Sequence, residues 1–449
     1  MRKYQAIFML LVFITISTRA QEQLLLKDDA VSTALYNNFG IKVAKNQVEI
    51  AENNQSILNS GFLPTLTGNA GATYNRDDAT IEFPGQILEN GEPRPDFELT
   101  KAEAQRYNSS LSLDYTLFDG MGRFYNYKSL KEQYQLSELQ ARETIENTVL
   151  QLLIIYFEVA RLSENVNVFK QALEISKDRI TRTEYAFEYG QNTKLDILNA
   201  QVDVTNDSIN LLTARQQLSN TRRDLNVVLN QNLNDTFRVD TVVVFIPRLQ
   251  LDDYISEAKD NNVALLQTKK NLLINEYDIK ISRSGYLPTV GLNGTYGWNL
   301  NQSAASVFFP GTNNETFNFS LGARLTWNLF DGGGTAVRIK NAKIAYENQD
   351  LLKKQIELEV ERDILNALDI YENRLNIYAI QEQNVITNQN NFERSKEQFQ
   401  LGRITSIEFR QAQINLLNAQ TNKNLAKYDA KLAELQLLQL TGQLLNVEL

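Results

Sequence analysis

The 449-residue sequence contains no cysteine and no histidine. The lack of cysteine excludes both a disulfide-stabilised fold and a lipid anchor attached to a cysteine after a signal peptide. The lack of histidine removes the commonest general base and a frequent zinc ligand. No glycine-rich phosphate loop is present, and the acidic residues form no pattern typical of a catalytic site. The sequence therefore predicts no enzyme, no cofactor and no metal site.

The sequence also lacks a long apolar segment beyond its N-terminus, where a spanning helix would need about 20 apolar residues. If the chain crosses a membrane, it must do so with strands. Residues 1–20 combine Arg2 and Lys3 with an apolar stretch and a small-residue cleavage pattern ending at Ala20. They predict a signal peptide, because an uncleaved anchor would need a longer apolar stretch. The net charge of −9 argues against a nucleic-acid partner.

The second half of the chain repeats the motifs of the first half in the same order. Repetition of this kind predicts a duplicated fold. We assign the repeats to residues 28–231 and 252–443, joined by a connector at 232–251 that contains one strand-like run, Val239 to Phe245. The paired motifs are SGFLPT and SGYLPT at 60–65 and 284–289, LFDG at 117–120 and 329–332, and YGQNTKLD and LGRITSIE at 189–196 and 401–408.

Each repeat also contains two runs in which apolar and polar residues alternate, a pattern that predicts strands with one apolar face. Runs of about ten residues match a tilted strand that crosses a bilayer. The membrane interface would then suit the aromatic residues near the strand ends, Tyr296, Trp298, Phe317 and Trp327. The alternative is a soluble hairpin with one face exposed to water. The predicted strands are 65–75 and 108–118 in the first repeat, and 289–299 and 317–329 in the second.

Residues 76–106 are polar and rich in acids, and we expect them to form an outward-facing loop between the first two strands. Four strands cannot close a barrel, and an open sheet edge cannot face lipid. Several subunits must therefore share one barrel. Because closure needs at least about eight strands, this argument alone permits a dimer or any larger ring.

Long helices should follow Asp119 and Asp331, whose side chains can cap a helix. About sixty residues without proline or glycine come after each, enough for a helix of roughly 90 Å. Apolar residues recur in heptads along these segments, which predicts coiled coils. The heptads include Val149, Leu152, Tyr156 and Val159 in the outgoing helix of the first repeat, Leu195, Leu198, Val202, Thr205, Ile209 and Leu212 in its returning helix, and Leu368, Tyr371, Leu375 and Tyr378 in the second repeat.

At the predicted hairpin tips, near residues 190 and 402, a glycine is followed by a threonine and then an acid. Thr193 with Asp196, and Thr405 with Glu408, have the spacing of a capping box. Capping alone explains both acids. Alternatively, several copies converge there as a ring of carboxylates that closes a tunnel or selects cations. Near the tips, one of the two apolar heptad positions becomes polar or charged in both repeats. Either the contact between two helices needs fewer apolar residues there, or the tip is packed loosely enough to open.

The order of signal peptide, twofold repeat, GFLPT and GYLPT before strand pairs, LFDG before a long helix, and YG-x5-D at a tip resembles the TolC family of outer-membrane efflux proteins. The resemblance covers nearly all of the mature chain. It implies a mixed α/β membrane protein: a homotrimer whose twelve strands form one outer-membrane barrel, surrounded by outer-membrane lipid, and whose coiled-coil helices form a periplasmic tunnel. Its partners would be a periplasmic adaptor (membrane fusion) protein and an inner-membrane transporter.

The resemblance also assigns roles by position. Two sequence departures bear on it, because Gln411 replaces a second aperture acid, and Ile404 stands where the family's gating arginine lies, with Arg403 one place earlier. The implied adaptor-docking residues are Gly190, Gln191, Asn192, Gly402, Arg403 and Ile404. The implied aperture residues are Asp196, Phe399, Arg403, Glu408 and Gln411.

The function that these features favour is a passive export duct in a tripartite efflux or type I secretion system. Its cargo could be a drug, a metal, a dye or a polypeptide. A general outer-membrane porin is an alternative, but a porin has no use for such long helices. A soluble periplasmic coiled-coil scaffold is another, opposed by the alternating segments and the signal peptide.

Overall fold

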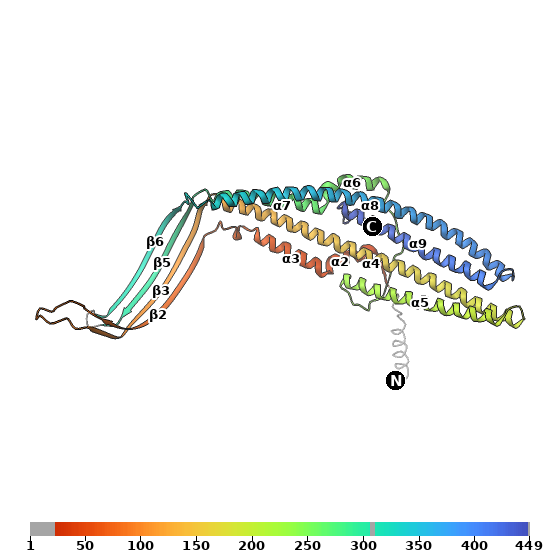
Figure 1. Ribbon diagram of the computed structural model, residues 1–449, viewed down its shortest axis with the longest axis horizontal. Coiled ribbons are helices and arrows are strands. Elements are labelled where there is room, and N and C mark those ends of the chain that lie inside the picture. The colour runs from red at the N-terminus through yellow and green to blue at the C-terminus, as the bar shows by residue number, and fades with distance from the viewer. Residues whose placement is uncertain (1–22, 306–309, 448–449) are drawn as a thin grey trace, which may run out of the picture. The chain divides into compact units, whose positions relative to one another are not determined.

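The structure, a computed structural model, describes residues 23–305 and 310–447 (Figure 1). The predicted signal peptide at 1–20 lies outside the described residues. The chain divides into two compact units. The sheet-containing unit consists of Ala51–Tyr134 and Asn271–Gln349, and the helical unit of the residues up to Ile50, Gln135–Lys270 and the residues from Asp350 onward.

A four-stranded antiparallel sheet dominates the sheet-containing unit, with the strand order β2-β3-β5-β6. Two hairpins, β2-β3 and β5-β6, are joined through the pairing of β3 with β5. Within the described chain, β2 and β6 are the edges of this sheet. The strands are β2 (Thr65–Ile81), β3 (Phe97–Asp119), β5 (Thr289–Ser303) and β6 (Thr312–Thr326).

The prediction of a loop over residues 76–106 is wrong, because β2 and β3 continue as a paired ribbon through most of it. Backbone bonds sustain the ladder although its first residues on β2, Arg76, Asp77 and Asp78, are all charged, and Arg76 faces Glu103 as an opposite-charge pair. A register shift follows Asp77, and the carboxylate of Asp78 accepts a hydrogen bond from the backbone amide of Lys101 at 2.5 Å. The loop that remains is 82–96.

The other strand bounds differ by smaller amounts. β3 begins before the predicted 108, and β5 extends past the predicted 299 to Ser303. β6 begins earlier than predicted and ends at Thr326, so Trp327 lies just beyond it. The Trp327 indole donates to the backbone oxygen of Tyr286 at 3.1 Å, which ties the end of β6 to the turn before β5.

Alternation leaves one face of the sheet apolar and exposed in the single chain. Phe317, Phe319 and Leu321 of β6 are 63%, 73% and 71% exposed. The polar residues Asn318 and Ser320 alternate with them on the strand. An apolar face of this size normally has another apolar phase against it.

Two helices begin at the predicted aspartates. The Asp119 carboxylate accepts from the backbone amide of Arg123 at 2.8 Å, and the Asp331 carboxylate accepts from that of Thr335 at 2.7 Å. Each aspartate thus satisfies a free amide in a first helical turn. The helices that follow, α4 (Gly122–Glu188) and α8 (Gly334–Gln400), are both 67 residues long.

Helices make up most of the remaining chain. None of those in the described residues combines the length and apolarity that a membrane crossing requires. Of the predicted strand run Val239 to Phe245, only Val239 is in a strand, because β4 pairs with the short β1 and ends there. The other elements are β1 (Gln23–Leu25), α2 (Lys27–Asn37), α3 (Phe39–Asn54), η1 (Ile57–Asn59), α5 (Lys194–Leu229), β4 (Phe237–Val239), α6 (Arg248–Asn261), α7 (Val263–Ser284) and α9 (Ser406–Leu440).

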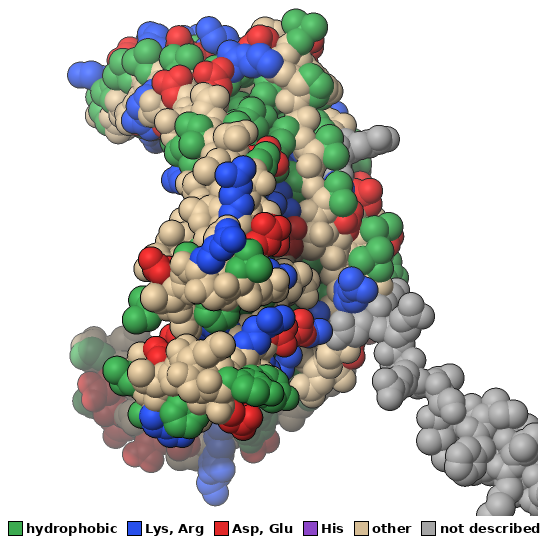
Figure 2. All heavy atoms as spheres, turned by 90° about the vertical axis from the view of Figure 1, so that its right-hand side faces the viewer, with side chains coloured by type: hydrophobic (Ala, Val, Ile, Leu, Met, Phe, Trp, Pro, Cys, Tyr) green, Lys and Arg blue, Asp and Glu red, His purple; other side chains and the backbone are tan. Residues whose placement is uncertain are grey.

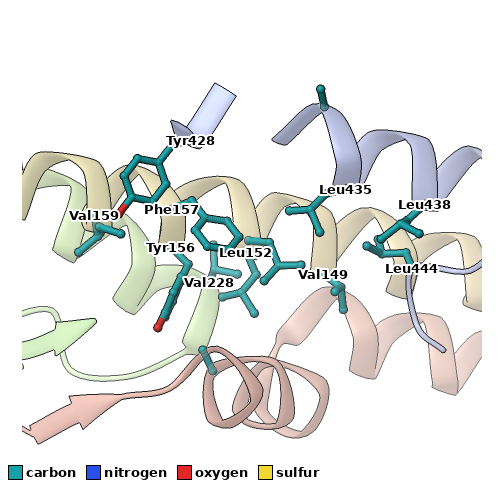
Figure 3. Close-up of a cluster of buried hydrophobic side chains, with 14 of the residues drawn as sticks. Val149, Leu152, Tyr156, Phe157, Val159, Val228, Tyr428, Leu435, Leu438 and Leu444 are labelled. Atoms are coloured by element: carbon teal, nitrogen blue, oxygen red, sulfur yellow. The ribbon is translucent and has the colours of Figure 1, made fainter. Parts of the chain in front are cut away.

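The core of the helical unit forms around α4 (Figure 3). Leu152 and Val159, two of the predicted heptad positions, are fully buried. Leu435 of α9 belongs to the same cluster. The Tyr156 hydroxyl donates to the Leu25 backbone oxygen at 2.9 Å, which fixes the start of the chain against this core. Full burial of one large apolar side chain contributes about 1.5–3 kcal/mol.

The predicted heptad positions of α5 are exposed in the single chain. Leu198, Val202 and Leu212 are 48%, 57% and 61% exposed. The helix instead buries a different stripe that includes Ala200 and Leu211. A periodic pattern marks an apolar face but does not say which partner covers it. The predicted stripe of α5 is thus left uncovered in the single chain.

Candidate functional site: the tips of the two helical hairpins

Each hairpin turns at a glycine with a left-handed backbone. Gly190 has φ +75° and Gly402 has φ +69°. Their amides donate to the backbone oxygens of Phe187 and Phe399 at 2.9 and 3.1 Å. The amide of the following residue, Gln191 in the first tip, reaches back one residue further to complete a helix C-cap. A side chain at either glycine would be strained, because left-handed backbone disfavours residues with a Cβ.

Both predicted capping boxes are present. The Asp196 carboxylate accepts from the Thr193 amide at 2.9 Å, and the Thr193 hydroxyl oxygen accepts from the Asp196 amide at 3.3 Å. The corresponding distances for Glu408 and Thr405 are 2.8 and 3.2 Å. Each acid therefore bonds within its own hairpin, as capping requires.

These bonds lower the pKa of both acids. Bonds from the hydroxyl and then the amide of Thr193 hold the pKa of Asp196 below its ordinary value. For Glu408 the amide of Thr405 has the largest effect and its hydroxyl adds to it. Hydrogen bonds to a carboxylate favour its charged form. Both tips therefore carry a fixed negative charge at neutral pH.

The remaining predicted residues lie close to the second tip. Phe399 stacks on Phe409, with ring centroids 4.9 Å apart and planes at 6°. Ile404 packs against the same aromatic cluster. Arg403 is exposed, and the Gln411 amide donates to the side-chain oxygen of Asn415 at 2.9 Å. Phe399 and Ile404 thus stabilise the second hairpin through contacts between its two helices.

Exposed residues surround the first turn as well. Gln191 is exposed and Asn192 is half-buried, as the turn between α4 and α5 requires. Figure 2 shows this end of the molecule with side chains of both charges and apolar side chains intermixed.

A buried charge network lies deeper between the two hairpins, and the sequence analysis missed it. The Arg410 guanidinium of α9 donates two bonds to the Asp207 carboxylate of α5, at 2.7 and 2.8 Å. Arg179 of α4 pairs with Asp203 of α5 and donates to the backbone oxygen of Ser406 at 3.3 Å. Arg179 and Asp207 are each only 2% exposed. We call these four side chains, Arg179, Asp203, Asp207 and Arg410, the tip network.

Burial and pairing act in opposite directions on the tip network. Burial lowers the pKa of Arg179 despite its bond to Asp203. For Arg410, burial alone would lower the pKa, but the bonds and charge of Asp207 outweigh it and raise the pKa. Two cations facing two carboxylates keep the buried site neutral. The i, i+4 spacing of Asp203 and Asp207 on one helix was the only sequence signal for this site.

Among the described residues, no cluster of acids has the geometry to hold a metal ion. The tips combine two glycine turns, the negative charges of Asp196 and Glu408, and the neutral tip network buried between the hairpins.

The sequence matches the profile of the family described as outer membrane efflux protein, over residues 30–231 and again over 254–443. The chain belongs to this family. It is 26% identical over 396 residues to the outer membrane protein TolC of Vibrio cholerae, a match covering 86% of this chain and 83% of that protein. It is 19% identical over 324 residues to the protease secretion protein PrtF of Dickeya chrysanthemi, covering 71% and 67%.

Solved outer-membrane channels share the fold. The CmeC outer membrane channel of Campylobacter jejuni superimposes with a TM-score of 0.72 at 19% identity, covering 93% of this chain and 86% of that one. This likeness, together with the family match, confirms the predicted combination of a long helical part with a few strands. By its family, the chain is an outer membrane efflux protein and not an enzyme.

Proposed function

We propose that this protein is the outer-membrane duct of a tripartite efflux or type I secretion system. Three copies would share one barrel in the outer membrane, and their helices would form a tunnel in the periplasm. An inner-membrane transporter would supply the energy, and a periplasmic adaptor would connect the two. The family description supports efflux, and the relative named for protease secretion supports export of polypeptides as a second possibility.

The observation that carries the proposal is the open, apolar-faced sheet. β2 and β6 are the edges of the sheet within the described chain, and the apolar residues of β6 are exposed. Unpaired strand edges cannot face lipid, so other subunits must supply strands to both edges. Strands of 15 to 23 residues are long enough to cross a bilayer and extend beyond it.

A test combines fractionation with a channel recording. We expect the protein in the outer-membrane fraction, with a detergent-corrected light-scattering mass of three chains and single channels in planar bilayers. A soluble monomer without channel activity would overturn the proposal. Deleting the gene of a candidate partner transporter, and measuring whether export falls as it does without the duct, would identify the system.

The hairpin tips would then close the inner end of the tunnel and meet the adaptor. The fixed charges of Asp196 and Glu408 support a ring of carboxylates there, since copies of the chain would bring them together. Phe399, Arg403 and Gln411 would complete the aperture. The docking surface would comprise the two turns: Gly190, Gln191 and Asn192, and Gly402, Arg403 and Ile404.

A further inference from the structure

The two long helices leave the sheet at the same end. β3 and β6 run in the same direction, because each is antiparallel to β5, which lies between them. α4 follows β3 along the chain, and α8 follows β6 (Figure 1). The apolar face of the sheet ends here in two exposed side chains, Leu117 and Leu329. In the proposed duct, this end of the sheet lies at the periplasmic boundary of the membrane.

Each of these helices carries two lysines at equivalent positions of the two repeats. They are Lys128 and Lys131 on α4, and Lys340 and Lys343 on α8, nine and twelve residues after the capping aspartate in both cases. The two lysines of a pair are three residues apart, so they lie on one face of their helix. All four are exposed. We call these four side chains the lysine collar.

The lysines of α4 extend back toward the sheet. The ammonium group of Lys128 lies 4.6 Å from the ring centroid of Phe124, and that of Lys131 lies 4.5 Å from the ring centroid of Tyr127. Each ring is about one turn nearer to the sheet, as expected because side chains on a helix tilt toward its N-terminus. At 1.5 Å per residue, Phe124 is only about 8 Å from Asp119 along the helix direction. The lipid headgroup layer is roughly 5–8 Å thick, so in the proposed duct these ammonium groups lie close to it.

Both helix starts have a net positive charge. Residues 119–131 and 331–343 each contain one acid and three basic residues, whereas the whole chain has a net charge of −9. In both segments the acid pairs with the arginine, at 3.2 and 3.7 Å, so that the remaining charge is that of the lysines. The loop 82–96, at the opposite end of the sheet, contains four acids and one basic residue. These segments at the two ends of the sheet therefore carry opposite net charges.

We propose that the lysine collar binds the phosphate groups of anionic phospholipids in the periplasmic leaflet of the outer membrane. This proposal rests on the proposed function, because it presumes that the sheet lies in that membrane. Lysines next to a membrane attract anionic headgroups over about one Debye length. The partner is a lipid surface because the exposed apolar residues Leu117 and Leu329 and the ring of Phe124 border the lysines on the side of the sheet. Apolar, aromatic and basic side chains in this order suit a membrane interface.

Tryptophan fluorescence can report which lipid lies at this level, because the chain contains only two tryptophans. Trp327 lies between the end of β6 and the start of α8. With Trp298→Phe, Trp327 becomes the single reporter. The protein is reconstituted in vesicles that mix phosphatidylcholine with phosphatidylglycerol, and one of the two lipids at a time carries bromine, which quenches tryptophan. We expect phosphatidylglycerol to be favoured several-fold next to Trp327, and the preference to fall as salt is added.

A matched pair of variants assigns the preference to the collar. Replacing all four collar lysines by glutamine should bring the preference close to one, because each lysine near an anionic surface contributes about a fivefold preference. Replacing them by arginine should preserve it. The control variant replaces four other exposed lysines of the hairpins by glutamine, which changes the net charge equally and should leave the preference unchanged. These control lysines are Lys170, Lys177, Lys194 and Lys396.

The same preference in the glutamine collar variant and the natural protein would overturn the proposal, and so would a preference that does not respond to salt. Loss of the preference in excess inorganic phosphate at constant ionic strength would overturn it as well, since the collar would then hold a free anion. Single channels recorded from the same vesicles would leave the proposed duct intact in each of these cases. A natural protein without channels would overturn the proposed function itself. Circular dichroism and light scattering would verify that each variant is folded and assembled.

Discussion

At the scale of single residues, Asp196 and Glu408 have two separable properties. Each accepts backbone hydrogen bonds as a helix cap, and each carries a charge. Replacing both by alanine removes both properties, so we expect a looser tip and a larger single-channel conductance. Replacing them by asparagine and glutamine keeps an acceptor for the cap and removes the charge.

The pair of double variants therefore separates the two roles of these acids. We expect Asp196→Asn with Glu408→Gln to lower cation selectivity, measured as a reversal potential in a salt gradient, with little change in conductance. If neither double variant changes conductance or selectivity, capping is the whole role of both acids.

The lowered pKa values make the tips sensitive to acid. A carboxyl with a lowered folded-state pKa stabilises the fold above its unfolded value, and this contribution is lost as the pH falls through the folded value. The ordinary values here are 3.8 for Asp196 and 4.5 for Glu408. We therefore expect the turns to lose amide-exchange protection below about pH 4 after correction for intrinsic exchange rates.

A matched variant checks the cause of that acid sensitivity. Thr193→Val removes the hydroxyl bond to Asp196, so the first tip should become less protected at neutral pH and less dependent on pH. The second tip serves as an internal reference in the same protein. Identical pH profiles in the variant and the natural protein would show that Thr193 does not set the pKa.

At the scale of elements, the tip network joins α4 and α5 to α9. Arg410→Met would leave the Asp207 carboxylate buried without its guanidinium, which typically costs about 3–5 kcal/mol. We expect a lower urea midpoint in the helical circular dichroism of the detergent-solubilised protein. Adding Asp207→Leu should recover much of the loss, because replacing a whole buried ion pair with apolar groups is often neutral. No recovery would mean that the network has a packing role beyond its charges.

The elements also show what the sequence could predict. The helix starts at Asp119 and Asp331 and both capping boxes follow from local hydrogen bonding, and all of them are present. The extension of β2 to Ile81 was missed because three consecutive charged residues, 76–78, interrupt the alternation, while the backbone bonds of the ladder continue past them. The tip network was missed because charged residues on a helix normally face water.

The heptad stripe on α5 has no partner in the single chain. Leu198, Val202 and Leu212 were correctly identified as an apolar face, but a single chain supplies no partner for it. Periodicity reports that a face is apolar, while the partner depends on which copies meet. The same limit applies to the adaptor and aperture roles of the tip residues, which stay predictions.

At the scale of the whole molecule, the apolar face of the sheet should meet lipid. Phe319→Arg would place a charge on that face, where arginine near the bilayer midplane costs about 2–4 kcal/mol. We expect less assembled protein in the outer-membrane fraction. The matched control, Ser320→Arg on the opposite face of β6, should assemble normally. Equal loss in both variants would contradict this assignment of the two faces.

The equal lengths of α4 and α8 have a consequence for how such a chain can change. At 1.5 Å per residue, 67 residues set a reach of about 100 Å. Seven residues added to both helices of one hairpin would displace its turn by about 10 Å relative to the turn of the other hairpin. A duct suited to a wider periplasm therefore needs the same insertion in both repeats. In the proposed duct, the length of the tunnel is therefore encoded by both repeats of one gene, and the two repeats have to change in length together.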